Sequence, residues 1–233
     1  RTTSGSLTPT QFSLEIAERR IQRLEPGGAT SSVDATPRMA AARLAYSRRL
    51  RVLTEDVEAI VLAEVGRAVA GLIEQGSISG TGSDNRPLGL LSLPGRLNQT
   101  FASATPTSAE LAQMLEKLGD QKMELERIVF LMHPSTAASL MQTEVASTSG
   151  QLVLCYGDNA YRVHGRPVFI SNSITEGKVI ALEPSFSRTV FFGAAQIVIE
   201  PYSGAVNGET TINILNAMDF ACIHQASVCV GSA

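Results

Sequence analysis

The sequence has few of the residues that most often carry enzyme and metal chemistry. Its 233 residues include three histidines, three cysteines, no tryptophan and only 5% aromatic residues. Cys155, Cys222 and Cys229 are far apart and form no CxxC pair, which excludes a disulfide framework and a zinc site built on paired cysteines. They are typical of small buried side chains in a reducing compartment. The scarcity of aromatic rings also argues against a stacking platform for bases or sugars.

Catalytic signatures are missing as well. The chain has no GxSxG, HxxxH or HExxH motif and no loop of clustered Asp and Asn residues. His133 and Ser135 lie two residues apart, but nothing in the sequence places an orienting carboxylate beside them, so a histidine at a strand end is favoured over a hydrolase pair. We therefore expect no catalytic residue, no metal ion and no cofactor.

Lysine and long apolar runs are also scarce. Only three of the 19 basic residues are lysine, and arginine concentrates early in the chain, in "ERRIQR" and "SRRLR". Because arginine makes two-point contacts with carboxylates, these segments predict subunit contacts, with solvated helix faces as the alternative. A net charge of −3 and a pI of about 5.7 argue against a dedicated nucleic-acid binder. No window holds the roughly 18 apolar residues of a membrane span, and no secretory signal is visible.

What remains fits a globular α+β protein with 44% hydrophobic residues, long enough for one large domain or two small ones. Apolar spacing predicts an amphipathic helix over residues 12–24 and a long helix over 54–75, capped by Thr54 and ended by Gly76. That long helix would measure roughly 30 Å. Between them, the small and apolar residues from 38 to 46 fit either a strand or a helix.

Helices and strands alternate in the second half. The patterns predict a helix over 105–120 capped by a Ser or Thr before Glu110, a buried strand over 127–134 and a short helix over 135–142. They then predict a strand after a Gly-Arg-Pro turn in 161–174 and further strands in 177–184 and 188–204. The last segment, 210–231, fits either a helix or a strand.

The stretch "SISGTGSDNRPLGLLSLPG", residues 77–95, raises the question of phosphate binding. A Walker-type loop needs a lysine directly after its last glycine, and no lysine follows Gly82 before Lys117. A dinucleotide fingerprint needs a preceding strand and a third glycine where Asn85 stands. Both nucleotide readings therefore fail on mechanism.

An architectural role explains the same residues. Gly80 and Gly82 let the chain turn sharply off the long helix, where a positive φ or a close backbone approach is needed. Pro87 then stiffens the return, and the leucines around Gly89 anchor it to the core or to a neighbour.

The order of these segments resembles the major capsid proteins of tailed bacteriophages of the Hong Kong 97 type. In that family a small-residue strand leads to a Ser-Arg-x-Leu segment, a long spine helix and a "GTGxxxxPxGL" loop. The matching residues are Ser47, Arg48, Leu50, Gly80, Thr81, Gly82, Pro87, Gly89 and Leu90. "HPSTAASLM", "VHGRPVFISNSI" and "INILNAMDFACIHQASVCV" follow in the family's order, so the likeness covers roughly residues 36–233.

The resemblance implies a capsid fold with peripheral and axial domains. Residues 37–104 would form a peripheral domain with the spine helix, residues 105–205 the axial domain, and residues 206–233 a return to the periphery. Residues 1–36 would be an N-terminal arm with a short or missing extended loop. The start at Arg1 fits a chain from which a phage protease has removed a scaffolding segment. Because the first lysine is Lys117, a crosslink from the usual lysine of the extended loop is not expected.

The function implied is self-assembly, in the cytoplasm of a host bacterium, into hexamers and pentamers of an icosahedral virion shell around double-stranded DNA. Portal, maturation protease and cement proteins are implied partners, DNA contact would be non-specific, and no membrane is involved. The inter-subunit contacts implied are Arg48, Arg49, Gly80, Gly82, Pro87 and Gly89. The alternatives are an encapsulin nanocompartment, which shares the fold and holds protein cargo, and an unrelated cytoplasmic α+β enzyme.

Overall fold

The chain forms two units, each with its own core. The computed structural model describes residues 19–24, 30–47, 57–145, 150–157, 159–200, 202, 206 and 208–233. The first unit comprises residues 1–77, 82–87 and 189–221, and the second comprises residues 78–81, 88–188 and 222–233. Neither unit is therefore one continuous stretch of sequence.

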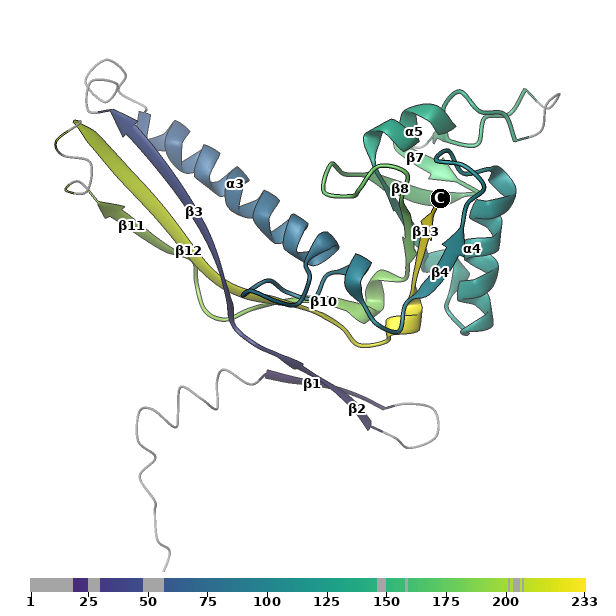
Figure 1. The fold of residues 1–233 in the computed structure, drawn as a ribbon, viewed down its shortest axis with the longest axis horizontal. Coiled ribbons are helices and arrows are strands. Elements are labelled where there is room, and N and C mark those ends of the chain that lie inside the picture. The colour runs from purple at the N-terminus through teal and green to yellow at the C-terminus, as the bar shows by residue number, and fades with distance from the viewer. Residues whose placement is uncertain are drawn as a thin grey trace, which may run out of the picture. The chain divides into compact units, whose positions relative to one another are not determined.

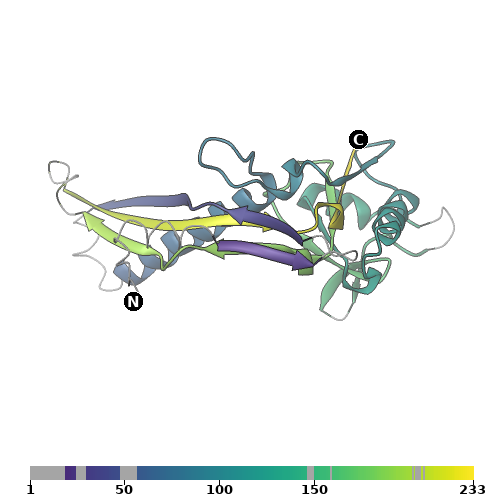
Figure 2. The ribbon, with the colours of Figure 1, turned by 90° about the horizontal axis from the view of Figure 1, so that it is seen from below.

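A four-stranded sheet is the frame of the first unit (Figures 1 and 2). Its strands are β3 (Arg38–Ser47), β10 (Ser187–Phe191), β11 (Gln196–Glu200) and β12 (Glu209–Cys222). β12 pairs antiparallel with β3 along residues 209–218 and with β11 along residues 211–215. Since both partners cover the same part of β12, they lie on its opposite edges, as Figure 2 shows. The ambiguous segment 38–46 is thus a strand, and so is the ambiguous segment 210–231 as far as residue 222.

Helix α3 (Val57–Ser79) lies along this sheet (Figure 1). Val61, Val65 and Val69, four residues apart, are at most 7% exposed and form one cluster with Tyr46 and Ile212 of the sheet. Each buried valine contributes about 1.5 kcal/mol or more, so packing on the sheet, in addition to helix propensity, stabilises α3. The long amphipathic helix expected from the sequence is confirmed from Val57 onward.

The expected end of that helix at Gly76 is wrong, because α3 continues to Ser79. A Cβ atom on Gly76 would lie 2.9 Å from Cγ of Pro87. The glycine therefore gives room to the proline ring within the helix and does not terminate it. The expected N-cap, Thr54, lies outside the described residues.

The helix expected over residues 12–24 is wrong in its described part. β1 (Arg19–Leu24) and β2 (Thr30–Ala35) form a two-stranded antiparallel sheet instead. Pairing with β2 gives the backbone of β1 its hydrogen-bond partners, and the sequence Pro-Gly-Gly between the strands opposes a continuous helix. This pair precedes β3, where a short extended loop is expected.

A seven-stranded mixed sheet forms the second unit, in the order β4-β13-β9-β5-β8-β7-β6. Its strands are β4 (Leu97–Thr100), β5 (Val129–Met132), β6 (Cys155–Gly157), β7 (Ala160–Val163), β8 (Arg166–Ile170), β9 (Val179–Leu182) and β13 (Val228–Ser232). Short 3-10 turns occupy Leu90–Ser92, Leu125–Arg127, Pro184–Phe186 and Gln225–Ser227.

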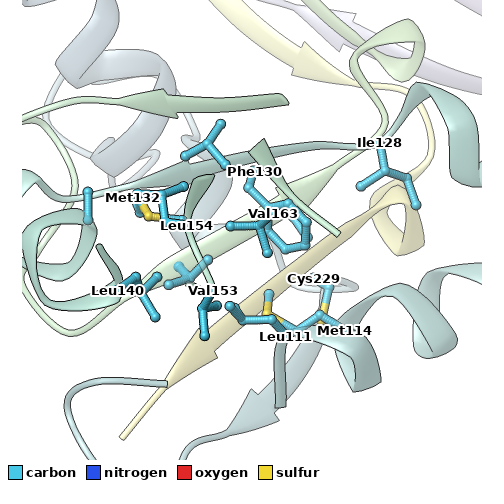
Figure 3. Packing of buried hydrophobic residues seen from close by; sticks show 14 of the residues in the cluster. Leu111, Met114, Ile128, Phe130, Met132, Leu140, Val153, Leu154, Val163 and Cys229 are labelled. Carbon is cyan, nitrogen blue, oxygen red and sulfur yellow. The ribbon is translucent and has the colours of Figure 1, made fainter. Parts of the chain in front are cut away.

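Two helices complete this unit, α4 (Ser108–Asp120) and α5 (Pro134–Leu140). Leu111, Met114 and Leu118 of α4 are fully buried with Phe130 of β5 and Cys229 of β13. Figure 3 shows Leu111, Met114 and Cys229 close together in this cluster. The helices and the buried strand expected between residues 105 and 142 are confirmed.

The turn between β7 and β8 lies earlier than expected. Arg166 and Pro167 already belong to β8, and the turn residues are His164 and Gly165, with φ values of 49° and 77°. The chain reverses at His164 and Gly165, which both have left-handed backbone conformations. The turn therefore begins one residue before the predicted Gly-Arg-Pro turn, and the arginine and proline lie in the strand.

Candidate functional site

The glycine-rich loop after α3 closes on itself. Thr81 and Leu88 form an antiparallel bridge. The backbone N–H of Gly82 donates to the carbonyl oxygen of Pro87, and that of Gly89 donates to the carbonyl oxygen of Gly80, each at 3.0 Å. A phosphate-binding loop needs amide hydrogens that point at the ligand. Those of Gly82 and Gly89 are used within the loop, so they do not form a phosphate cradle.

Residues 83–86 make the turn of this loop. The backbone N–H of Arg86 donates to the carbonyl oxygen of Ser83 at 2.9 Å. Asp84 and Asn85 between them have φ values of 52° and 61°. Two successive positive φ values define a type I′ turn, and Asp and Asn tolerate this region better than most residues. Gly82 enters the turn with a φ of 77°.

Gly89 is required by a close backbone approach. A Cβ atom at this position would lie 2.6 Å from the backbone nitrogen of Gly80 and 2.8 Å from both the carbonyl carbon and the oxygen of Ile78. Backbone atoms at these distances cannot move aside as a flexible side chain can. Gly89 therefore keeps the return of the loop against the end of α3.

Arg38, at the start of β3, ties the turn to the sheet. Its Nη1 donates to the carbonyl oxygen of Gly82 at 3.3 Å and to that of Arg86. Its Nε lies 3.5 Å from Oδ1 of Asp219, a residue that is only 6% exposed. Oδ2 of Asp219 accepts the backbone N–H of Thr36 at 2.9 Å. A buried carboxylate thus has a cation and a backbone donor, and loss of either partner is costly.

The predicted loop residues differ in how accessible they are. Gly80, Pro87 and Gly89 are buried in the subunit, Gly82 is half-buried, and residues 83–86 are exposed. The part of the loop that faces solvent is therefore the turn itself. A role for this loop in subunit contacts stays a prediction.

Arg48 and Arg49 lie outside the described residues, so their predicted part in subunit contacts also stays a prediction. Arg43, earlier on β3, is exposed and lines a shallow hollow of about 210 Å³ together with Val198 and Glu200 of β11. This hollow lies on the four-stranded sheet of the first unit.

The histidine near a serine caps a helix. Nδ1 of His133 accepts the backbone N–H of Ser135 at 3.2 Å, and the Ser135 hydroxyl lies 2.7 Å from the same nitrogen. Glu176 lies 3.9 Å from Nδ1 as well. In a catalytic triad the serine and the carboxylate contact different ring nitrogens, so this arrangement is a cap on α5 and not a triad.

The described part of the chain also lacks two features that would indicate other functions. No group of three or more His, Cys, Asp and Glu side chains there is arranged to hold a metal ion. No helix in those residues has the length and apolar character needed to cross a membrane.

The sequence did not indicate the exposed edge of the first unit's sheet. Ile197, Val198 and Ile199 of β11 are 53%, 40% and 58% exposed. Three successive branched residues normally indicate a strand buried on both faces. Only the topology reveals that β11 is an edge strand, so the sequence held no signal for its exposure.

The comparisons with known proteins decide the family. A family model described as the phage capsid family matches residues 13–233. The chain belongs to the phage capsid family. No curated protein matches the sequence.

Solved structures share the fold of this capsid protein. One is a chain from the capsid of an empty GTA particle, with a TM-score of 0.73, 14% identity and coverage of 100% of this chain and 94% of that one. Another is the holo-SrpI encapsulin complex of Synechococcus elongatus PCC 7942, with a TM-score of 0.68, 13% identity and coverage of 100% and 91%. A chain among the major capsid and decoration proteins of phage G gives a TM-score of 0.66, 10% identity and coverage of 93% and 84%.

The expected Hong Kong 97-like α+β fold and the expected family are therefore confirmed. This capsid protein is a structural component of the virion that self-assembles into the icosahedral head shell of a phage or phage-like particle, and it is not an enzyme.

Proposed function

We propose that the shell built by this capsid protein encloses double-stranded DNA and consists of hexamers and pentamers of the chain. The observation that carries the proposal is the match of the phage capsid family to residues 13–233. The alternative is a shell of the encapsulin type with protein cargo, favoured by the likeness to the holo-SrpI encapsulin complex. The fold is common to both, so the contents of the particle distinguish them.

The two units suit two roles in a capsomer. We assign the peripheral role to the first unit, which holds α3 and the long sheet, and the axial role to the second unit with its seven-stranded sheet. Portal, maturation protease and cement proteins are the proposed partners. Ring-closing contacts between identical chains need two different, complementary patches on each subunit.

Arg48 and Arg49 are proposed contacts between subunits. Replacing either by Glu reverses a charge at an interface, where a like-charge contact costs several kcal/mol across many copies. We expect Arg48→Glu and Arg49→Glu to leave a folded subunit that no longer forms shells. Negative-stain microscopy and circular dichroism measure the two properties, with Arg127→Glu, an exposed residue paired with Glu124, as the control. Intact shells from both interface variants would count against the assignment.

Particle contents test the proposal as a whole. Particles from infected or induced cells are purified by size-exclusion chromatography, imaged, and treated with nuclease before their contents are extracted. In infected or induced cells we expect nuclease-protected double-stranded DNA inside the shells. A single protein cargo without DNA would instead support the encapsulin alternative, and a chain that stays monomeric in every condition would overturn both.

A further inference from the structure

The strand β11 is an open edge of the four-stranded sheet. It pairs with β12 along one side, and no other strand among the described residues pairs with it. An exposed, apolar edge strand presents free backbone donors and acceptors and readily adds another strand, so natural proteins normally blunt or cover such edges. Here the three central residues are aliphatic, and Ile197 and Ile199 are more than half exposed.

Both faces of β11 are exposed: α3 does not pack on one face, and a shallow hollow lies on the other. Ile197 and Ile199 pair with Ile214 and Ile212, so they lie on the face of the sheet that α3 covers. The buried stripe of α3 clusters with β3 and β12 and leaves β11 out. Val198 points to the other face, where it lines the shallow hollow. Strand addition along the edge would cover part of both faces at once.

The sequence of β11 complements itself. In the strand "QIVIE", an antiparallel copy centred on Val198 places Val198 opposite its own counterpart and Ile197 opposite Ile199. The same register places Gln196 opposite Glu200, so that an amide can donate to a carboxylate. Every cross-strand pair is then apolar with apolar or donor with acceptor, which is the pairing that stabilises antiparallel sheets.

We propose that β11 pairs with β11 of a second copy of this chain as antiparallel strands centred on Val198. The contact is symmetric, so it closes after two subunits and removes the open edge from both. The occupant is a second copy because the strand is self-complementary and because the family self-assembles. The inference rests on the proposed shell and adds a specific contact within it.

Disulfide trapping tests the register. Directly opposite residues in antiparallel strands have Cα atoms about 4.5 to 5.5 Å apart, within the range of about 4.4 to 6.8 Å that a disulfide allows. Two copies of residue 196 would be offset by four positions, about 14 Å, which is too far. The variants are Val198→Cys and the matched control Gln196→Cys, both carrying Cys155→Ser to remove the exposed native cysteine. Shells of the full chain are oxidised with diamide and analysed on non-reducing gels.

We expect Val198→Cys shells to give a covalent dimer at least about tenfold more abundant than that of Gln196→Cys, as the distance limit demands. Equal dimer in both variants, or none in Val198→Cys, overturns the proposal. If shells form but no dimer appears, only the β11 pairing fails. If neither the variants nor the unmodified chain form shells, both the proposed function and the β11 pairing fail.

Charge mixing gives a second, independent readout. In Val198→Lys and in Val198→Glu, like charges meet across the two-fold axis, so we expect each variant alone to lose most of its assembled fraction. A mixture of the two places Lys opposite Glu, and we expect it to recover shells at least about fivefold over either variant alone. Absence of recovery, with both variants folded by circular dichroism, overturns the self-facing position of Val198.

Discussion

At the scale of single residues, the glycines of this capsid protein differ in what they do, although the sequence makes them look alike. Gly89 has backbone atoms where a side chain would go, whereas Gly66 on α3 has nothing within 4 Å of an added Cβ. The sequence predicts a glycine-rich turn in which Gly80 and Gly82 need a positive φ or a close backbone approach, but the close approach occurs at Gly89. The partner atoms of Gly89 belong to residues nine to eleven positions earlier. Such a contact is set by the folded chain, and no local pattern reveals it.

Two alanine substitutions are therefore expected to have opposite signs. Gly89→Ala should lower the free energy of unfolding by about 2–3 kcal/mol, because the new Cβ overlaps backbone that cannot retreat. Gly66→Ala should raise it by about 0.5–1 kcal/mol, since alanine favours an exposed helix position. Urea denaturation of unassembled protein measures both. An unchanged midpoint for Gly89→Ala would show that the loop adapts more freely than its geometry implies.

The three cysteines are also expected to differ in reactivity. Burial raises the pKa of the Cys229 thiol to about 11 and also raises the pKa of Cys222. Cys155 is exposed, so the expectation of a buried side chain is wrong at that position. At pH 8 only about one Cys229 in a thousand is thiolate, so alkylation is suppressed by charge state as well as by access. Iodoacetamide should add one label to the folded, unassembled subunit and three to the urea-unfolded chain, as mass spectrometry can measure. Two or more labels on the folded subunit would contradict the burial of these thiols.

At the scale of helices and strands, the sequence predicts correctly those features that depend on neighbouring residues alone. The N-terminus of α4 is a complete capping box: Thr107 Oγ1 accepts the backbone N–H of Glu110, and the Glu110 carboxylate accepts that of Thr107 at 2.7 Å. Four adjacent residues contain this information, so it is visible in sequence. Residues 19–24 form a strand because β2 pairs with them, and most residues of β12 are buried because strands pair with both of its edges. Those outcomes depend on distant partners, and the sequence left them wrong or ambiguous.

The α4 cap predicts a pH dependence of stability. Hydrogen bonds from the backbone N–H groups of Thr107 and Ala102 lower the pKa of Glu110. A group whose pKa is lowered in the folded state stabilises above its ordinary pKa, and that contribution is lost as the pH falls through the folded value. Glu110→Gln should therefore cost about 0.5 kcal/mol at pH 7, because the site is partly open to solvent.

This difference between Glu110→Gln and the unmodified chain should shrink as the pH falls below about 4. Urea midpoints at pH 7, 5 and 3 measure it. Lys117→Gln, a substitution in the last turn of the same helix, is the control and should show no such acid dependence. A difference that stays constant down to pH 3 would assign the effect to packing and not to the charge.

At the scale of the whole molecule, function comes from repeated contacts and not from any one site. Each interface can be modest, because a closed shell links every subunit through several contacts at once. The net charge of −3 fits this role, since a shell protein needs no affinity for a DNA sequence and holds its contents by enclosure. Only the assembled form is then expected to retain DNA.

High salt distinguishes DNA that is enclosed by the shell from DNA that is bound by the subunits. Affinity through phosphate contacts falls steeply with salt, so a subunit that truly binds DNA releases it at high ionic strength. We expect unassembled subunits to bind double-stranded DNA more weakly than about 10 µM at physiological salt, with no sequence preference. Filled shells should keep nuclease-protected DNA through a wash in 1 M NaCl, roughly seven times physiological ionic strength, because confinement is not screened. Fluorescence anisotropy measures the first quantity and nuclease protection the second. Tight, salt-sensitive binding by the free subunit, with DNA lost from intact shells at high salt, would mean that contact and not closure holds the genome.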